Sequence, residues 1–157
     1  MTKKRLLTAF GGAFGLLPLL GFLAIGCASA PHANADSVRA TLDGFMSELN
    51  ALDVDRIASY FADDVTAFVP LAQAARVEGK PALVEIFRAY CETTRKTTPR
   101  TNIVPEKLTV DLNGSIAIVT FEFTSPASVA RRTFVFRYRQ GRWLISHFHA
   151  SNFTLAK

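Results

Sequence analysis

The second half of the chain most constrains the fold, because it contains four runs with the composition of β-strands. These runs, rich in β-branched and aromatic residues, span 101–112, 115–124, 128–139 and 142–153. They are separated by Asn113-Gly114, Ser125-Pro126 and Gln140-Gly141. Asn-Gly between two such runs is the strongest short-range signal for a hairpin. We therefore predict a strongly bent antiparallel sheet built from consecutive hairpins.

The first half has the periodicity of helices instead. From Ser37 onward, apolar residues recur at helical spacing at Val38, Leu42, Phe45, Met46 and Leu49. Asp36 or Ser37 can cap this first helix, Asp53 a second and shorter one, and a third begins near Pro81. A short β-branched run, 65–70, lies between the second and third helices. The fold class expected for residues 36–157 is α+β, a single domain with three N-terminal helices packed on the curved sheet.

The first 35 residues have the features of an export signal. Lys3, Lys4 and Arg5 precede an apolar run, 6–26, and its glycines and Pro18 argue against a membrane-spanning helix. We expect cleavage after Ala35, at an A-x-A site, and a periplasmic or secreted protein. The alternative is cleavage before Cys27, where "AIGC" resembles a lipobox, and this would give a membrane-anchored lipoprotein. Contact with a membrane is expected only in that case.

Composition argues against a disulfide-rich fold and gives no support for nucleic-acid binding. The chain has two cysteines, and Cys27 is either removed with the signal or lipidated. Only Cys91 then remains as a free cysteine, so the mature chain has no disulfide framework. Loss of three basic residues with the signal reduces 18 Lys and Arg to 15, against 13 acidic residues, and the net charge falls from +5 to +2. This charge gives no reason to expect nucleic-acid binding.

Both faces of the expected sheet require a partner. Residues 115–124 and 133–138 are apolar at both alternating sets of positions, so one face can pack on the helices while the other must also be covered. An apolar face left in water promotes aggregation. We therefore predict a homodimer or larger homo-oligomer that forms through the outer face.

Three stretches carry a resemblance to a known superfamily. Residues 49–70 ("LNALDVDRIASYFADDVTAFVP"), 79–90 ("GKPALVEIFRAY") and 141–151 ("GRWLISHFHAS") resemble nuclear-transport-factor-2-like (NTF2-like) proteins. Within that superfamily the chain is similar to SnoaL-like proteins and to the association domain of calcium/calmodulin-dependent kinase II. The resemblance implies a cone whose sheet curls around a pocket, with dimerisation through the opposite face.

The resemblance also allows a test for enzymatic activity. The three working positions of the ketosteroid isomerases fall on Phe45, Val69 and Phe134, and none of these side chains can transfer or donate a proton. The arginines that line the pocket of the association domain fall on Phe134 and Ala150. We therefore favour a non-catalytic protein without a cofactor, either a binder of a small apolar ligand or an association module. The alternative is a SnoaL-like enzyme that uses Tyr60, Tyr138, His147 or His149.

Strand alternation places Trp143, Ile145, His147 and His149 on one face of the last strand. The resemblance implies that this is the outer face. The residues expected at the subunit interface are therefore Glu122, Arg137, Trp143, His147 and His149. The two histidines could share a metal ion with Glu122 as a third ligand, but hydrogen bonding at the interface is the better explanation, and we predict no metal.

The residues expected in the pocket are aromatic or small. They are Phe45, Tyr60, Val69, Tyr90, Phe121, Phe134, Phe136, Tyr138, Ser146, Phe148 and Asn152. Two interpretations stay open, because such rings can fill the cone as an ordinary core or line a hollow cavity for an apolar guest. The basic stretches 95–100 and 130–134 are expected to be solvated loop and edge positions without a function.

Overall fold

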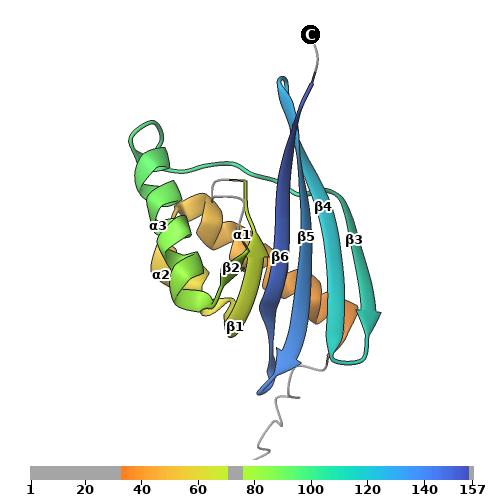
Figure 1. Ribbon diagram of the computed structural model, residues 1–157. Coiled ribbons are helices and arrows are strands. Elements are labelled where there is room, and N and C mark those ends of the chain that lie inside the picture. Colours follow the sequence, from red (N-terminus) through yellow and green to blue (C-terminus); the bar gives the residue numbers. More distant parts are fainter. Residues whose placement is uncertain (1–32, 71–75, 156–157) are drawn as a thin grey trace, which may run out of the picture.

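Three helices cover one face of a six-stranded sheet (Figure 1), in a computed structural model that describes residues 33–70 and 76–155. The helices are α1 (Ala35–Ala51), α2 (Val54–Ser59) and α3 (Lys80–Arg95). The strands are β1 (Phe61–Phe68), β2 (Val77–Glu78), β3 (Glu106–Asn113), β4 (Ile116–Ser125), β5 (Ser128–Arg139) and β6 (Arg142–Thr154). The predicted α+β fold class is confirmed. Residues 1–32, which include Cys27 and most of the expected export signal, lie outside the described residues.

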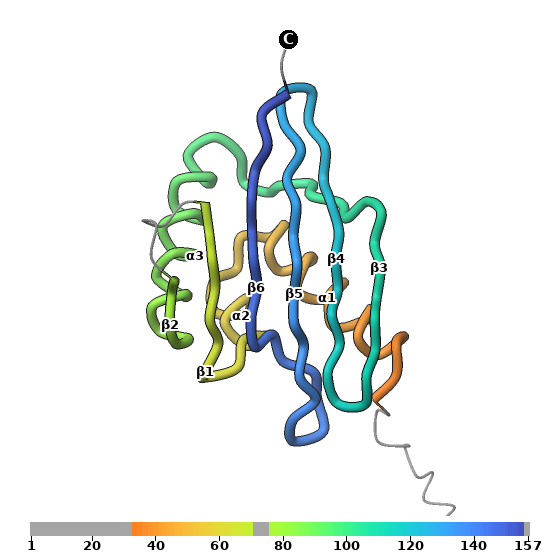
Figure 2. The backbone as a smooth tube through the Cα atoms, turned by 45° about the vertical axis from the view of Figure 1, so that its right-hand side comes forward, coloured from red at the N-terminus to blue at the C-terminus, as the bar shows by residue number. Residues whose placement is uncertain are grey.

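The strands follow the order β2-β1-β6-β5-β4-β3. The three predicted hairpins connect β3 to β6, and each of their pairs is antiparallel. However, β1 runs parallel to β6, so the sheet is mixed where an antiparallel one was expected. Figure 2 shows β1 beside β6, with the helices behind the sheet. This orientation is possible because α3 and its flanking segments, rather than a tight turn, connect β1 to the hairpins.

The ends of the helices differ from the prediction at one point. Asp53 caps α2 as expected, and its side chain accepts a hydrogen bond from the backbone N–H of Arg56 at 3.1 Å. In contrast, α1 begins at Ala35 and its cap is Asn34, whose side chain accepts from the N–H of Ser37 at 2.8 Å. The expected start of the mature chain, Asp36, therefore falls inside the first turn of α1.

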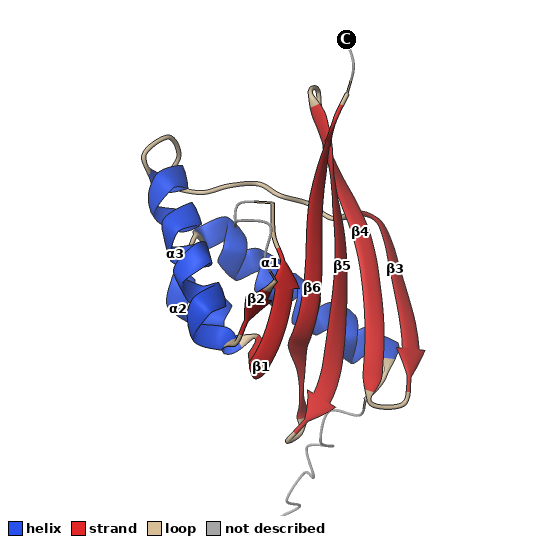
Figure 3. Cartoon of the chain, in the orientation of Figure 1, coloured by secondary structure: helices blue, strands red, loops and turns tan. Residues whose placement is uncertain are grey.

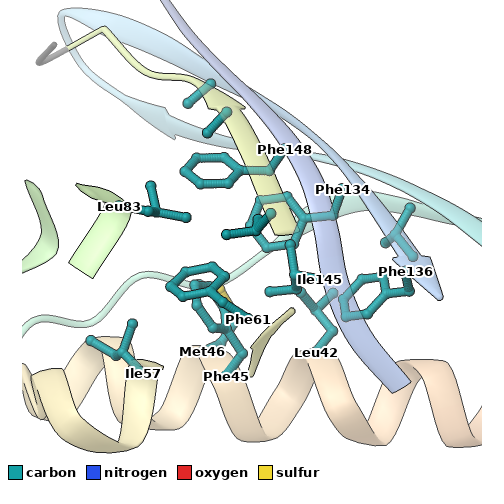
Figure 4. Close-up of a cluster of buried hydrophobic side chains, with 14 of the residues drawn as sticks. Leu42, Phe45, Met46, Ile57, Phe61, Leu83, Phe134, Phe136, Ile145 and Phe148 are labelled. Carbon is teal, nitrogen blue, oxygen red and sulfur yellow. The ribbon is translucent and has the colours of Figure 1, made fainter. Parts of the chain in front are cut away.

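Aromatic rings fill the narrow part of the cone. Figure 3 shows α1 passing across the strands behind the sheet, and Figure 4 shows its side chains reaching the strands. The ring of Phe45 lies 5.9 Å from that of Phe61 and 5.5 Å from that of Phe134, measured between centroids. Both contacts are edge-to-face, the arrangement favoured by aromatic quadrupoles. This part of the cone is a packed core.

A bulge in β6 changes which side chains point inward. Val135 pairs with His147 but Phe136 pairs with Ile145, so Ser146 is an extra residue in β6. Ile145, before the bulge, is fully buried, and Phe148, beyond it, is 3% exposed. Simple alternation was therefore wrong for Trp143 and Ile145, which point toward the helices. The bulge restores the expected orientation for the histidines and Phe148.

No helix within residues 33–70 and 76–155 has both the length and the apolarity required to span a membrane.

Candidate ligand-binding cavity

The wide end of the cone is hollow, with a cavity of about 580 Å³. This volume is within the range of small-molecule sites, roughly 300–1,000 Å³. The sheet forms one wall, because the register aligns Phe121, Arg132 and Ala150 as neighbours on the inner face. The cavity continues along β4 and β5 to Ser125 and Ser128, at the turn between these strands. Aromatic residues thus pack as a core in one part of the cone and line a cavity in another.

Helices α1 and α3 form the opposite wall. Phe45, Met46 and Leu49 come from α1, and their spacing of one, three and four residues places them on one side of that helix. Phe87 and Tyr90 come from the apolar side of α3. Burial raises the pKa of the Tyr90 hydroxyl, so this group is a neutral hydrogen-bonding partner.

The segment between α3 and β3 forms part of the rim. Asn102, Ile103 and Val104 line the cavity, and Val104 is 59% exposed. Asn50 holds this segment to α1, since its side-chain oxygen accepts from the N–H of Ile103 at 2.7 Å and from the hydroxyl of Thr101 at 2.8 Å. The rim is therefore fixed by a polar contact with the helix.

Seven of the eleven predicted pocket residues line this cavity: Phe45, Val69, Tyr90, Phe121, Phe134, Phe148 and Asn152. The other four, which were expected there, lie elsewhere. Phe136 is fully buried in the packed core, and Ser146 sits at the bulge, where its hydroxyl donates to the carbonyl of Val135 at 3.1 Å.

Tyr60 and Tyr138 also lie away from the cavity lining. The ring of Tyr60 packs against that of Phe45 at 5.9 Å and covers Gly44. Tyr138 follows Phe134 and Phe136 along the inner face of β5 and makes an edge-to-face contact with Trp143, with 5.2 Å between centroids. Tyr138 was mispredicted because β5 continues past the cavity, so inward orientation alone does not bring a side chain to the hollow part.

Sequence reasoning missed Arg132, which was expected to be a solvated edge residue. It lies on the inner face of β5, lines the cavity, and its guanidinium carbon lies 4.6 Å from the centroid of the Phe123 ring. Burial lowers the pKa of this guanidinium. Its inward orientation could have been predicted from its position two residues before Phe134, because residues at that spacing share a face of a strand.

The two histidines occupy the outer face of the sheet. His147 hydrogen bonds through Nδ1 with the hydroxyl of Thr66 at 2.8 Å. The ring of Phe68 lies 5.9 Å from His147 and 6.1 Å from His149. Burial and the nearby His149 and Arg76 lower the pKa of His147. Both imidazoles are thus separated by the sheet from the cavity.

The other predicted interface residues have different surroundings. Glu122 and Arg137 lie on the outer face, and Glu122 accepts from Lys107 Nζ at 2.8 Å. Trp143 was wrongly assigned to this face, because the bulge turns it inward. It is 3% exposed, and its indole N–H donates to the hydroxyl of Ser37 at 2.9 Å.

The metal site considered for the histidines is not assembled. Glu122 lies on β4, which β5 separates from the histidines of β6. Among residues 33–70 and 76–155 no group of three or more His, Cys, Asp and Glu side chains is placed to hold a metal ion.

Comparison with known proteins assigns the family. A profile of the SnoaL-like domain matches residues 38–156. The chain belongs to the SnoaL-like family. No curated protein matches this SnoaL-like chain.

Solved structures with the NTF2-like fold resemble this SnoaL-like protein over most of its length. An NTF2-like protein of unknown function from Pseudomonas putida KT2440 is 25% identical, with a TM-score of 0.60 over 74% of this chain and 84% of that one. The CaMKII hub of S. rosetta is 19% identical, with a TM-score of 0.59 over 78% and 99% of the respective chains. A proposed dehydratase of the NTF2-like family from Streptomyces avermitilis is 19% identical, with a TM-score of 0.61 over 77% and 96%.

These neighbours confirm the predicted fold and differ in their roles. A hub and a proposed dehydratase share the fold, so the fold of a SnoaL-like protein does not by itself assign an activity. The role must be argued from the cavity.

Proposed function

We propose that this SnoaL-like protein is a non-catalytic binding protein that takes a small apolar molecule into the cavity. The observation that carries the proposal is the hollow wide end of the cone, about 580 Å³ in volume. Its wall is mainly aromatic and aliphatic, as in sites that recognise apolar ligands through burial. Tyr90 and Asn152 supply hydrogen-bonding groups that can orient a guest.

The chemistry of the wall supports binding rather than proton transfer. Phe45, Val69 and Phe134, the positions that correspond to isomerase working residues, all line the cavity. A bound carbonyl compound would meet hydrocarbon there instead of a general base and an oxyanion hole. Glu106 provides the carboxylate of the cavity lining. It lies at the exposed rim and accepts a hydrogen bond from the hydroxyl of Thr124 at 3.1 Å.

The side chains suspected in the enzymatic alternative are not near this wall. Tyr60 and Tyr138 pack outside the cavity lining, and His147 and His149 lie on the other face of the sheet. A catalytic group must come within hydrogen-bonding reach of its substrate. These positions therefore favour the binding role over catalysis in the cavity.

The proposal is tested with N-phenyl-1-naphthylamine, a neutral apolar dye whose fluorescence rises on burial. Ala150, which is 8% exposed and lines the cavity, is replaced by Trp to fill the space. The matched control is Ser151→Trp, which adds the same ring to the opposite face of β6. We expect the dye to bind wild type and Ser151→Trp but not Ala150→Trp. The absence of dye binding to the folded wild type would refute the proposal.

We also propose that the protein forms a homodimer or larger homo-oligomer through its outer sheet face. Support comes from exposed apolar side chains on that face, since Phe68 is 45%, Ile116 42% and Ile118 43% exposed. With His147 and His149 they give a mixed apolar and polar surface across β1, β6 and β4. Similarity to the CaMKII hub of S. rosetta is in keeping with assembly.

Light scattering after size-exclusion chromatography tests the assembly. Ile118→Glu places a charge within the proposed interface, whereas Thr93→Glu places one on the exposed side of α3, on the other side of the sheet. We expect Ile118→Glu to reduce the mass to that of a single chain and Thr93→Glu to leave the oligomer intact. A wild-type protein that is monomeric at micromolar concentration would contradict the proposal.

We also propose that the protein is exported. The position of the α1 cap is relevant to which of the two cleavage sites is used. Cleavage after Ala35 would delete Asn34, the cap, and put a new positive terminus at the start of α1. Loss of a capping side chain costs about 1 kcal/mol, and a positive charge at a helix N-terminus is unfavourable. Processing before Cys27 retains the cap and would anchor the protein through a lipid. Mass spectrometry of the mature N-terminus distinguishes the two sites.

A further inference from the structure

We propose that the guest of the cavity is an amphipathic carboxylate, an apolar body with one carboxylate group, which Arg132 binds through a two-pronged hydrogen bond. This inference rests on the proposed function, since it assigns the ligand class of the same cavity. It depends on three features of Arg132: its place in an apolar wall, its lack of an acidic partner, and the part of its guanidinium that is left available.

Arg132 stands between apolar side chains of the sheet. Its neighbours in the register are Phe121 on β4 and Ala150 on β6, and both line the cavity. The face of the guanidinium lies over the Phe123 ring, which stabilises the cation through the ring quadrupole. Arg132 is partly buried, and a partly desolvated charge is stabilised by a partner of opposite charge.

No acidic side chain of the protein neutralises this cation. All 13 Asp and Glu residues lie within the described ranges, and none of them forms an ion pair with Arg132. Glu106, the carboxylate of the cavity lining, is on β3, with β4 between it and Arg132. A negative charge from outside the chain would therefore complete the site.

The hydrogen bonds of Arg132 hold one side of the guanidinium and leave another available. Nη1 donates to the carbonyls of Arg131 and Ser151, at 2.7 and 3.0 Å, and Nη1 and Nη2 both approach Asn152 Oδ1, at 3.4 and 3.3 Å. The Nε–H and the second N–H of Nη2 have no acceptor in the described part of the chain. These two donors lie along one edge of the planar group, with the spacing that matches the two oxygens of a carboxylate.

The rest of the cavity fits the apolar part of the same ligand. Phe134 and Phe148 follow Phe121 and Ala150 along the inner face toward the packed core, so an apolar chain can extend inward from a carboxylate at Arg132. Tyr90 also lines this region, and burial raises the pKa of its hydroxyl, with a hydrogen bond from Thr94 and the nearby Arg132 acting in the opposite direction. Its hydroxyl is a neutral donor that can serve the same anion.

Isothermal titration calorimetry with decanoate and decan-1-ol tests the inference. Both probes have the same apolar chain, and at about pH 7.5 only decanoate carries a charge. The variants are Arg132→Gln and, as a matched control, Arg131→Gln, which removes the same charge from the adjacent residue on the outer face. Arg132→Lys keeps the charge without the two-pronged geometry. Binding of decan-1-ol shows that each variant retains its fold and cavity.

We expect wild type and Arg131→Gln to bind decanoate roughly tenfold to a hundredfold more tightly than decan-1-ol, from one charge-assisted contact. Arg132→Gln should lose this preference while its affinity for decan-1-ol is unchanged, and Arg132→Lys should keep part of it. Equal affinity of wild type for the two probes would overturn the inference and leave the apolar binding function standing. An equal loss in Arg131→Gln would also overturn it, and failure of both probes to bind wild type would refute the binding function itself.

Discussion

Asn50 on α1 binds both backbone polar groups of Ile103, which is 53 residues further along the chain. Its Oδ1 accepts from the Ile103 N–H at 2.7 Å, and its Nδ2 donates to the Ile103 carbonyl at 2.9 Å. The side chain thus takes the place that a neighbouring strand would have in a sheet. Since Ile103 lines the cavity, this contact connects the stability of the fold to the geometry of the binding site.

Asn50→Ala should destabilise the protein by about 2 kcal/mol, because it leaves the part-buried backbone groups of Ile103 without partners. It should also weaken binding of the apolar dye, since the rim is no longer held to α1. Asn50→Asp, which keeps the acceptor but loses the donor, is expected to cost less. Urea denaturation and dye titration measure both effects. An Asn50→Ala variant as stable as wild type would show that the rim is fixed by other contacts.

Trp143→Phe should lower the free energy of unfolding by about 1 kcal/mol, because the indole N–H donates to the Ser37 hydroxyl at 2.9 Å. This contact ties the start of β6 to the first turn of α1. In a double-mutant cycle with Ser37→Ala the two substitutions should be less than additive. Additive effects would mean that burial of the ring, rather than the hydrogen bond, accounts for the contribution of Trp143.

Gly44→Ala should be destabilising even though alanine favours helices. A Cβ at Gly44 would lie 2.5 Å from Tyr60 Oη and 3.3 Å from Cζ, so the tyrosine must move. In a Tyr60→Phe background the closest of these atoms is removed, and Gly44→Ala should be better tolerated by about 1 kcal/mol. Thermal denaturation of the four proteins gives this difference. The same effect of Gly44→Ala in both backgrounds would exclude the steric explanation.

His147 should make stability depend on pH just below neutrality. Its surroundings lower its pKa from the ordinary value of 6.5, with burial as the largest cause. The unfolded chain therefore binds more protons than the folded one at pH values below 6.5 and above the folded pKa, and the free energy of unfolding falls as the pH falls through this window. His147→Gln should reduce this dependence, and Ser151→Gln, on the same face of β6, should leave it unchanged. Urea denaturation across the window provides the test, and an unchanged slope in His147→Gln would assign the dependence to other groups.

The sequence correctly predicted the three helices, the four hairpin strands and the fold class because those follow from local patterns. It did not predict β2, and it placed the start of β1 at residue 65 instead of Phe61. Helical spacing from Val38 to Leu49 and the turn residues Asn113-Gly114 and Gln140-Gly141 depend on neighbours within a few positions. The inward orientation of Phe121, Phe134 and Phe148 followed from alternation together with a resemblance to relatives of the same fold. These three are among the seven of eleven predicted pocket residues that line the cavity.

Tertiary structure alone decided the features that depend on contacts between distant residues. The bulge at Ser146 reversed Trp143 because it is defined by how β6 pairs with β5, and an extra residue leaves no mark in the alternation of one strand. Whether an inward ring meets the packed core or the cavity depends on how far α1 and α3 extend over the sheet. The residues around Arg132 in the sequence suggest a surface position. Only the neighbouring strands show that it faces an apolar cavity without an acidic partner. Local sequence specifies periodicity, whereas register and cavity are set by free energies of packing summed over segments that meet only in the folded state.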